Sequence, residues 1–187
     1  MEQPLPVQSD LDRRRFLRWG IAAVAAAAMP TPAWATALGT AKRRLSFVNL
    51  HTDETLTALY WANGSYQRNA VQDINYLLRD FRTGDVHAID LRLLDLLYTL
   101  QHRVKSQSPF QVISGYRSPA TNARLAALSD GVARRSYHVK GMAIDIALTD
   151  RTLPALHQAA LSLQAGGVGF YPKPGFVHVD VGPVRTW

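Results

Sequence analysis

The sequence predicts an α+β domain with an antiparallel sheet and helices on one side of it. β-rich runs and helical periodicities follow one another in irregular order along residues 45–181. Hydrophobic residues make up 47% of the 187 residues, which is enough for a core and too much for a disordered chain. The length fits one domain with an appendage.

The first 35 residues are predicted to be a signal peptide, so that the domain spans residues 36–187. Four arginines between positions 13 and 18 precede an apolar run from Trp19 to Met29. As a helix this run reaches about 16 Å, which is too short for a bilayer core of about 30 Å, and we expect no stable membrane anchor. Ala33-Trp34-Ala35 supplies the small residues that signal peptidase needs, so we expect cleavage after Ala35.

The arginine-rich segment Arg13–Arg18 resembles a twin-arginine export signal, in which two arginines precede any residue, Phe, Leu and a basic residue. An ordinary Sec signal is the alternative, and both predict a periplasmic protein. The formal net charge is +7, and loss of the leader removes four basic and three acidic residues, which leaves +6. In that compartment the charge indicates attraction to an anionic cell wall rather than a nucleic-acid partner.

The elements of the first half are a hairpin followed by two helices. Two β-rich runs, Leu45–Leu50 and Thr55–Trp61, flank a turn, and Asn63-Gly64 marks a second turn. Apolar residues at helical spacing predict one helix from Val71 through Phe81 to near Gly84. They predict another over Ile89–Val104, with Asp90 as N-cap.

The second half mixes strands and helices. We expect strands at 110–113, 142–148, 168–171 and 176–181, and helices from Ser118-Pro119 through Leu128 and over Leu153–Leu163. The chain has no cysteine. This excludes disulfides, thiol nucleophiles and cysteine-ligated metal sites, so any chemistry depends on other side chains.

A metal site is predicted from two pairs of His and Asp. His138 and Asp145 can meet only if the chain reverses near Lys140-Gly141, where Gly141 is free to adopt a positive φ. In the strand that follows, Asp145 shares its face with two alanines, which leave room for an ion.

A second pair lies near the C-terminus. In Phe176–Val181 three valines take one face, so His178 and Asp180 project together from the other. Neutral imidazole and carboxylate are suitable zinc ligands. Half-buried structural histidines are the alternative, but two His and two Asp in such positions favour a metal.

The segment Ser114-Gly115-Tyr116-Arg117-Ser118 joins a strand to a helix, where loops often present functional side chains. Arg117 could clamp a carboxylate or polarise a carbonyl oxygen. A helix N-terminus with Ser118 as N-cap and a solvated Arg117 is an equally good interpretation of the local sequence.

These motifs together resemble the zinc D-Ala-D-Ala metallopeptidase family, which is related in fold to lysostaphin and the hedgehog signalling domain. The resemblance rests on Ser114–Ser118 with Asn122, on Ser136-x-His138-x-x-Gly141-x-Ala143-x-Asp145, and on the late His178. More closely, nearly the whole chain is similar to the periplasmic murein endopeptidases of that family.

The resemblance implies a hedgehog/DD-peptidase-like fold and a Zn²⁺ ion held by His138, Asp145 and His178, with water at the fourth position. Arg117 would stabilise the oxyanion or seat the peptide. The substrate-binding residues implied beside it are Ser114, Tyr116, Ser136 and Tyr137.

The general base departs from the pattern of that family. Many relatives carry an acid three residues before the last histidine, where this chain has Gly175. Asp180 is the substitute candidate for the base, and it could instead orient a ligand or compete for the metal. His51 and His157 have no motif support and are expected to be structural.

The predicted function is hydrolysis of peptide cross-links in peptidoglycan by a zinc peptidase, which opens the mesh for wall growth. The alternatives are a carboxypeptidase that trims a terminal D-amino acid and a non-catalytic peptidoglycan-binding module. The sequence indicates neither the preferred cross-link nor the oligomeric state.

Overall fold

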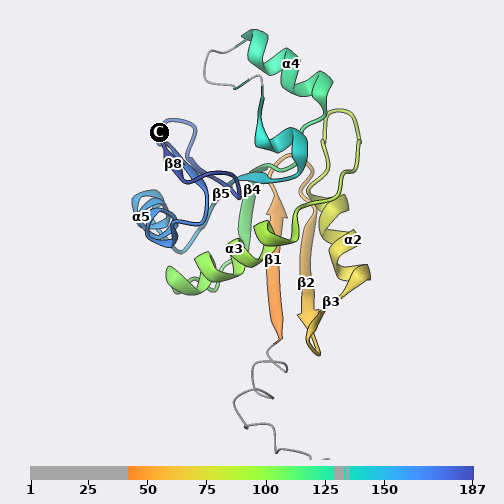
Figure 1. The fold of residues 1–187 in the computed structure, drawn as a ribbon, viewed down its shortest axis with the longest axis vertical. Helices are drawn as coiled ribbons and strands as arrows, with labels where there is room; N and C mark the ends of the chain where they lie inside the picture. Colours follow the sequence, from red (N-terminus) through yellow and green to blue (C-terminus); the bar gives the residue numbers. More distant parts are fainter. Residues whose placement is uncertain (1–41, 129–132, 134) are drawn as a thin grey trace, which may run out of the picture. The chain divides into compact units, whose positions relative to one another are not determined.

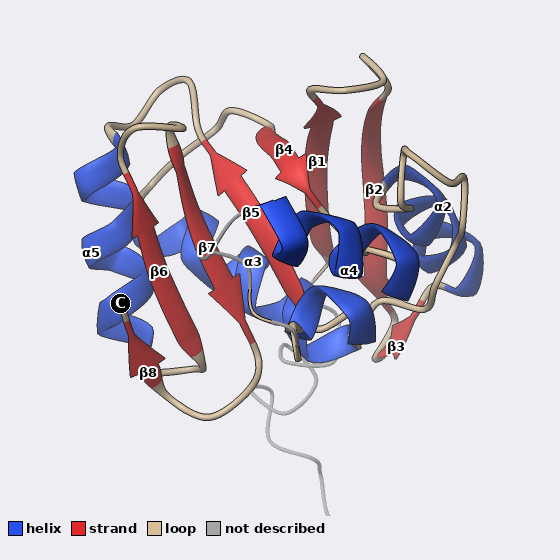
Figure 2. Ribbon diagram, turned by 90° about the horizontal axis from the view of Figure 1, so that it is seen from above, coloured by secondary structure: helices blue, strands red, loops and turns tan. Residues whose placement is uncertain are grey.

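A computed structural model describes residues 42–187 except 129–132 and 134. The predicted signal peptide, residues 1–35, lies outside the described residues. The described part contains an eight-stranded sheet in the order β3-β2-β1-β4-β5-β7-β6-β8 (Figure 2). The strands are β1 (Arg43–Asn49), β2 (Thr55–Ala62), β3 (Ser65–Tyr66), β4 (Phe110–Ser114), β5 (Ala143–Ala147), β6 (Gly167–Tyr171), β7 (Phe176–Asp180) and β8 (Arg185–Thr186).

The sheet is mixed, which corrects the prediction of an antiparallel sheet. β1 and β2 form the expected antiparallel hairpin, but β1 pairs with β4 in parallel, and so does β6 with β8. A parallel pair needs a long crossover, and the two helices between β2 and β4 provide one for β4. Alternation within a strand indicates its faces but not the direction of its neighbour, so the sequence pattern did not reveal these two pairings.

The helices are α2 (Arg68–Leu77), α3 (Leu91–Arg103), α4 (Pro119–Leu128) and α5 (Leu153–Leu163), with a 3₁₀ turn, η1, at Tyr137–Lys140. Asp90 caps α3 as expected by accepting a hydrogen bond from the backbone N–H of Arg92 at 2.9 Å. α2 ends earlier than predicted, because the Leu78 carbonyl accepts from the Tyr116 N–H at 2.8 Å and the chain then turns around Asp80.

Three helices cover one face of the sheet. α2, α3 and α5 contribute Ile74, Leu97 and Leu156 to one hydrophobic cluster, which also contains Phe47 and Ile146 from the strands. Figure 1 shows α2 beside β2, where the two elements pack together.

The fourth helix corrects the expectation that all helices lie on one side. α4 adds no residue to the hydrophobic cluster, and its Leu128 is 77% exposed. In Figure 2 it lies in front of the sheet, whereas α3 and α5 lie behind. Its alanine-rich sequence has no wide apolar stripe to bury against the sheet.

The chain reversal expected near Gly141 is confirmed. Gly141 ends η1 with φ +64°, a left-handed conformation that favours glycine, and a Cβ atom there would collide with the carbonyl oxygen of Ala88. The reversal carries the chain from η1 directly into β5. Among the residues that the structure describes, no helix is long and apolar enough to cross a membrane.

Candidate metal centre

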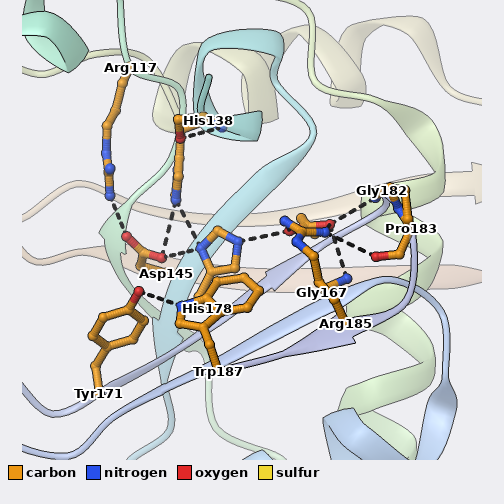
Figure 3. Close-up of polar contacts among 12 residues, drawn as sticks. Arg117, His138, Asp145, Gly167, Tyr171, His178, Gly182, Pro183, Arg185 and Trp187 are labelled. Atoms are coloured by element: carbon orange, nitrogen blue, oxygen red, sulfur yellow. Dashed lines mark hydrogen bonds and ion pairs between the residues drawn. The ribbon is translucent and has the colours of Figure 1, made fainter. Parts of the chain in front are cut away.

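Three side chains from separate elements converge on the sheet face that is turned away from the hydrophobic cluster. His138 comes from η1, Asp145 from β5 and His178 from β7, and all three are buried. The antiparallel register sets Asp145 directly opposite His178, with Asp145 Oδ1 2.8 Å from His178 Nδ1. His138 Nε2 lies 3.2 Å from each of these two atoms (Figure 3). The structure therefore brings together the three residues that were predicted to bind a metal.

The partners on the far side of each imidazole determine which ring nitrogens carry protons. His138 Nδ1 lies 2.7 Å from the Gly115 carbonyl oxygen, which can only accept, so Nδ1 is the donor. His178 Nε2 lies 3.0 Å from Asp180 Oδ2 and donates to that carboxylate in the same way. In the neutral rings, His138 Nε2 and His178 Nδ1 therefore present lone pairs toward the Asp145 oxygen.

Charge in this cluster favours a cation at its centre. Burial lowers the pKa of His138 and keeps that ring neutral. Burial also opposes charge on His178, but hydrogen bonds to Asp145 and Asp180 outweigh it and raise the pKa of His178. Two imidazole nitrogens and one carboxylate oxygen also form a ligand set suited to Zn²⁺, so these residues fit a metal.

Asp180 stands behind His178 rather than in the cleft. It is fully buried, and Arg185 donates to both of its oxygens at 2.6 and 3.1 Å. The backbone N–H groups of Gly167 and Gly182 add hydrogen bonds of 3.0 and 2.8 Å. Burial opposes the charge of Asp180, but these donors and His178 hold its pKa well below the usual range. This placement suits the orienting role that the sequence left open better than that of a general base.

Arg117 lies on the other side of the cluster and holds Asp145. Its Nη2 donates to Asp145 Oδ2 at 2.5 Å and its Nε donates to the Ser114 hydroxyl at 2.8 Å. Its backbone N–H donates to the His138 carbonyl at 3.3 Å. Arg117 thus fixes a predicted metal ligand through Nη2 and is itself held by Ser114 through Nε, and Nη1 forms no hydrogen bond within the described part of the chain.

An open cleft of about 320 Å³ borders the cluster. Its walls include Ser136 and Tyr137, two of the residues predicted to bind substrate. The Ser136 hydroxyl also caps η1 by accepting from the His138 N–H at 3.3 Å. The remaining described lining residues are Arg117, Ala133, Arg135, His138, Asp145, Tyr171, Phe176, His178, Arg185 and Trp187.

Two other residues predicted to bind substrate do not line the cleft. Tyr116 belongs to the hydrophobic cluster and stacks on His87, with ring centres 4.7 Å apart. Ser114 is buried beneath Arg117. Their placement does not fit direct substrate contact, because the loop turns inward at Tyr116 to bond with the end of α2.

The two histidines expected to be structural lie outside the cluster. His51 stacks on Phe81 at 3.9 Å, and its Nε2 lies 2.9 Å from the Ile113 carbonyl oxygen. His157 stacks on Phe170 at 4.6 Å.

Sequence reasoning missed Arg185 and Trp187, both of which line the cleft. They belong to or follow β8, a two-residue strand too short for an alternation pattern. Gly169 carried a weak signal, since a glycine inside a strand often marks close approach of another group.

Comparison with known proteins identifies the family of the chain. Residues 37–187 match the model of the family described as peptidoglycan L,D-endopeptidase MepK. The chain belongs to the MepK family. The MepK protein of Escherichia coli K12 is 44% identical over 178 residues, which cover 95% of this chain and 98% of that protein. A Haemophilus influenzae relative is 37% identical over 179 residues, covering 95% and 96%.

Membership of the MepK family confirms that the chain is a peptidase. Residues 10–30 match the twin-arginine translocation signal, which confirms the predicted export by that pathway to the periplasm. The Sec alternative is not needed.

Proposed function

We propose that residues 36–187 form a zinc-dependent endopeptidase that hydrolyses L,D peptide cross-links of peptidoglycan. The observation that carries this proposal is the convergence of His138, Asp145 and His178 on one point in an open cleft. The L,D bond type comes from the names of the MepK relatives.

The three converging residues would hold Zn²⁺. When bound, the metal polarises the scissile carbonyl and lowers the pKa of a bound water to near neutrality. A divalent ion with one carboxylate and two neutral imidazoles leaves the centre at net +1. Within the described residues, Asp145 is the only acidic side chain that lines the cleft.

The other side chains of the site would hold the ligands and attract the peptide. Asp180 keeps His178 in the tautomer whose Nδ1 lone pair faces Asp145 and would bind the metal, and Arg185 fixes Asp180. Arg117 orients Asp145 and keeps Nη1 for a substrate oxygen. Arg135, which is exposed on the cleft wall, adds positive charge that favours a peptide with free carboxylates.

Two structural expectations accompany this function. The mixed sheet with its site on the face opposite the main helix layer is compatible with the fold shared by zinc D-Ala-D-Ala peptidases and hedgehog domains, and we infer that fold here. We also expect signal peptidase to cut after Ala35, just before the family match begins at residue 37.

Digestion of purified sacculi tests the proposal. The zinc-loaded mature protein should release muropeptides from cross-linked sacculi and create new termini at L,D bonds, because only an endopeptidase cuts inside the bridge. A chelator should stop the release, and added Zn²⁺ should restore it.

The alternatives give other products. A carboxypeptidase releases single D-amino acids from uncross-linked pentapeptides and leaves the bridges intact. A binding module creates no new termini, and its attachment to sacculi does not change with chelator. Either result contradicts the proposal.

A further inference from the structure

We propose that the indole of Trp187 is a substrate-binding surface of the cleft, against which the aliphatic side chain of a peptide residue near the scissile bond packs. The proposal rests on the proposed function for the identity of the substrate. It assigns a specificity-determining contact to a residue that the sequence motifs do not include.

Trp187 is exposed and also firmly held. It keeps 50% of its surface accessible although it lines the cleft. Its backbone N–H donates to the Val168 carbonyl at 3.2 Å, and its main-chain oxygen accepts from the Phe170 N–H at 3.1 Å. Its Nε1–H donates to the Tyr171 hydroxyl at 2.6 Å. Backbone and indole are therefore fixed together.

Strand β6 has a matching gap for the indole. A Cβ atom on Gly169 would lie 2.7 Å from Cε2 and Nε1 of Trp187, a distance that real side chains do not tolerate. The absence of a side chain at Gly169 thus lets the ring lie directly on the strand. An aromatic ring that is ordered in this way and still faces solvent loses little further entropy when a ligand covers it.

The indole lies beside the metal centre. Its ring centre is 5.2 Å from that of His178. Tyr171, its hydrogen-bond partner, lies beside it in Figure 3 and stacks on Phe176 at 4.6 Å and 22°, and all three aromatic residues line the cleft. A peptide residue close to His178 would therefore meet an apolar surface here.

The chemistry of this surface indicates the class of side chain that it takes. Aromatic faces bury methylene groups favourably, and the Arg185 guanidinium lies 5.0 Å from the indole centre. A side chain with an aliphatic stem and a polar or anionic end fits both features. Arg185 is already paired with Asp180, so the apolar contact with Trp187 supplies the main discrimination.

Steady-state kinetics of the zinc-loaded protein on cross-linked muropeptides test the proposal. Trp187→Ala should raise KM about tenfold, which corresponds to about 1.4 kcal/mol of binding free energy, and leave kcat within about twofold. Trp187→Phe keeps an aromatic face and should stay close to the wild type. Tyr76→Ala removes an aromatic side chain that is 55% exposed on α2 outside the cleft, and it should change neither constant.

Two further measurements separate substrate contact from a structural role. The zinc content of Trp187→Ala should equal that of the wild type. Binding of uncross-linked muropeptides to the zinc-loaded protein should weaken in Trp187→Ala and not in Tyr76→Ala, as measured by calorimetry. An unchanged KM, or a loss of zinc together with kcat, would overturn the proposal.

Failure of the proposed function has a different signature. In that case the wild type cleaves no cross-linked muropeptide, and the calorimetric comparison alone decides the role of Trp187. If the wild type binds the muropeptides and Trp187→Ala binds them more weakly, Trp187 is a substrate-binding surface as proposed. Binding that is equal in the two proteins, or absent from both, rejects it.

Discussion

Two polar clusters in this protein differ in the way their atoms meet. At Asp95, Arg43 and Tyr60 donate to one carboxylate oxygen at 2.7 and 3.0 Å, and Tyr66 donates to the other at 2.6 Å. Each contact there joins a donor to an acceptor. At the candidate metal centre, by contrast, all three facing atoms are acceptors while the rings are neutral. They are the Asp145 Oδ1, His138 Nε2 and His178 Nδ1 atoms.

The difference separates a cluster that is satisfied within the fold from one that we propose to bind a metal. The Asp95 cluster is complete within the chain and links β1, β2 and β3 to α3. While both rings are neutral, the candidate metal centre holds three acceptors that cannot satisfy one another, and a cation between them would complete it.

The largest expected effect comes from removing a predicted metal ligand. His138→Ala should lower cleavage of cross-linked muropeptides by on the order of a thousandfold or more, since the metal supplies several kcal/mol of charge stabilisation. Bound zinc should fall in parallel, as measured by atomic absorption. His157→Ala removes a histidine outside the cleft and should keep both zinc and activity. Full activity of His138→Ala would contradict the interpretation of the His138, Asp145 and His178 cluster as a metal centre.

A smaller effect is expected from changing Asp180, which is hydrogen-bonded to the predicted metal ligand His178. Asp180→Asn should weaken zinc affinity about tenfold to a hundredfold, because His178 loses the carboxylate that orients it. Competition with a chromophoric chelator measures this affinity. If Asp180 were the general base, kcat would fall at saturating zinc while the affinity stayed unchanged. Asp150→Asn alters a carboxylate outside the cleft and serves as the control.

Disruption of the Asp95 cluster should lower the stability of the fold and leave activity unchanged. Asp95→Asn removes the charge that three donors share and should lower the free energy of unfolding by about 1–3 kcal/mol. Urea denaturation of the zinc-loaded protein measures this change. The kcat and KM for muropeptides should remain those of the wild type, and a loss of zinc would contradict the separation of the two clusters.

The smallest effect is a pH dependence of stability at Tyr66. Burial and the hydrogen bond to Asp95 raise the pKa of Tyr66 to about 12. Between its ordinary pKa near 10 and that value, the unfolded chain has lost the phenolic proton and the folded protein retains it, so stability falls as pH rises. Tyr66→Phe should show a shallower fall between about pH 10 and 12. Equal slopes for the two proteins would reject the assignment.

The local geometry of the candidate metal centre was predictable from strand alternation and a single glycine, whereas the choice of the three ligands came from the resemblance to the zinc D-Ala-D-Ala metallopeptidases. Alternation put Asp145 and His178 on the face away from the core, and Gly141 marked the reversal that carries the chain from His138 into β5. The structure bears out each of these local features. The zinc ion itself remains a proposal.

Features that depend on distant contacts were not predictable. Tyr116 turns into the core because its N–H meets the Leu78 carbonyl, a contact that the motif around it does not reveal. The partner of Asp180 is Arg185 in a two-residue strand, which leaves no periodicity in the sequence. The parallel pairing of β1 with β4 likewise depends on how α2 and α3, which lie between these strands along the chain, pack on the sheet.

The register between β5 and β7 has a consequence for how the metal is acquired. Asp145 and His178 are separated by 33 residues in the chain and meet only when these strands pair. The unfolded chain therefore offers no preformed site, and the free energy of metal binding adds to that of folding. A twin-arginine signal exports proteins that have already folded, so the centre exists before translocation. A metal bound at this centre would then be selected among the ions of the cytoplasm, before export.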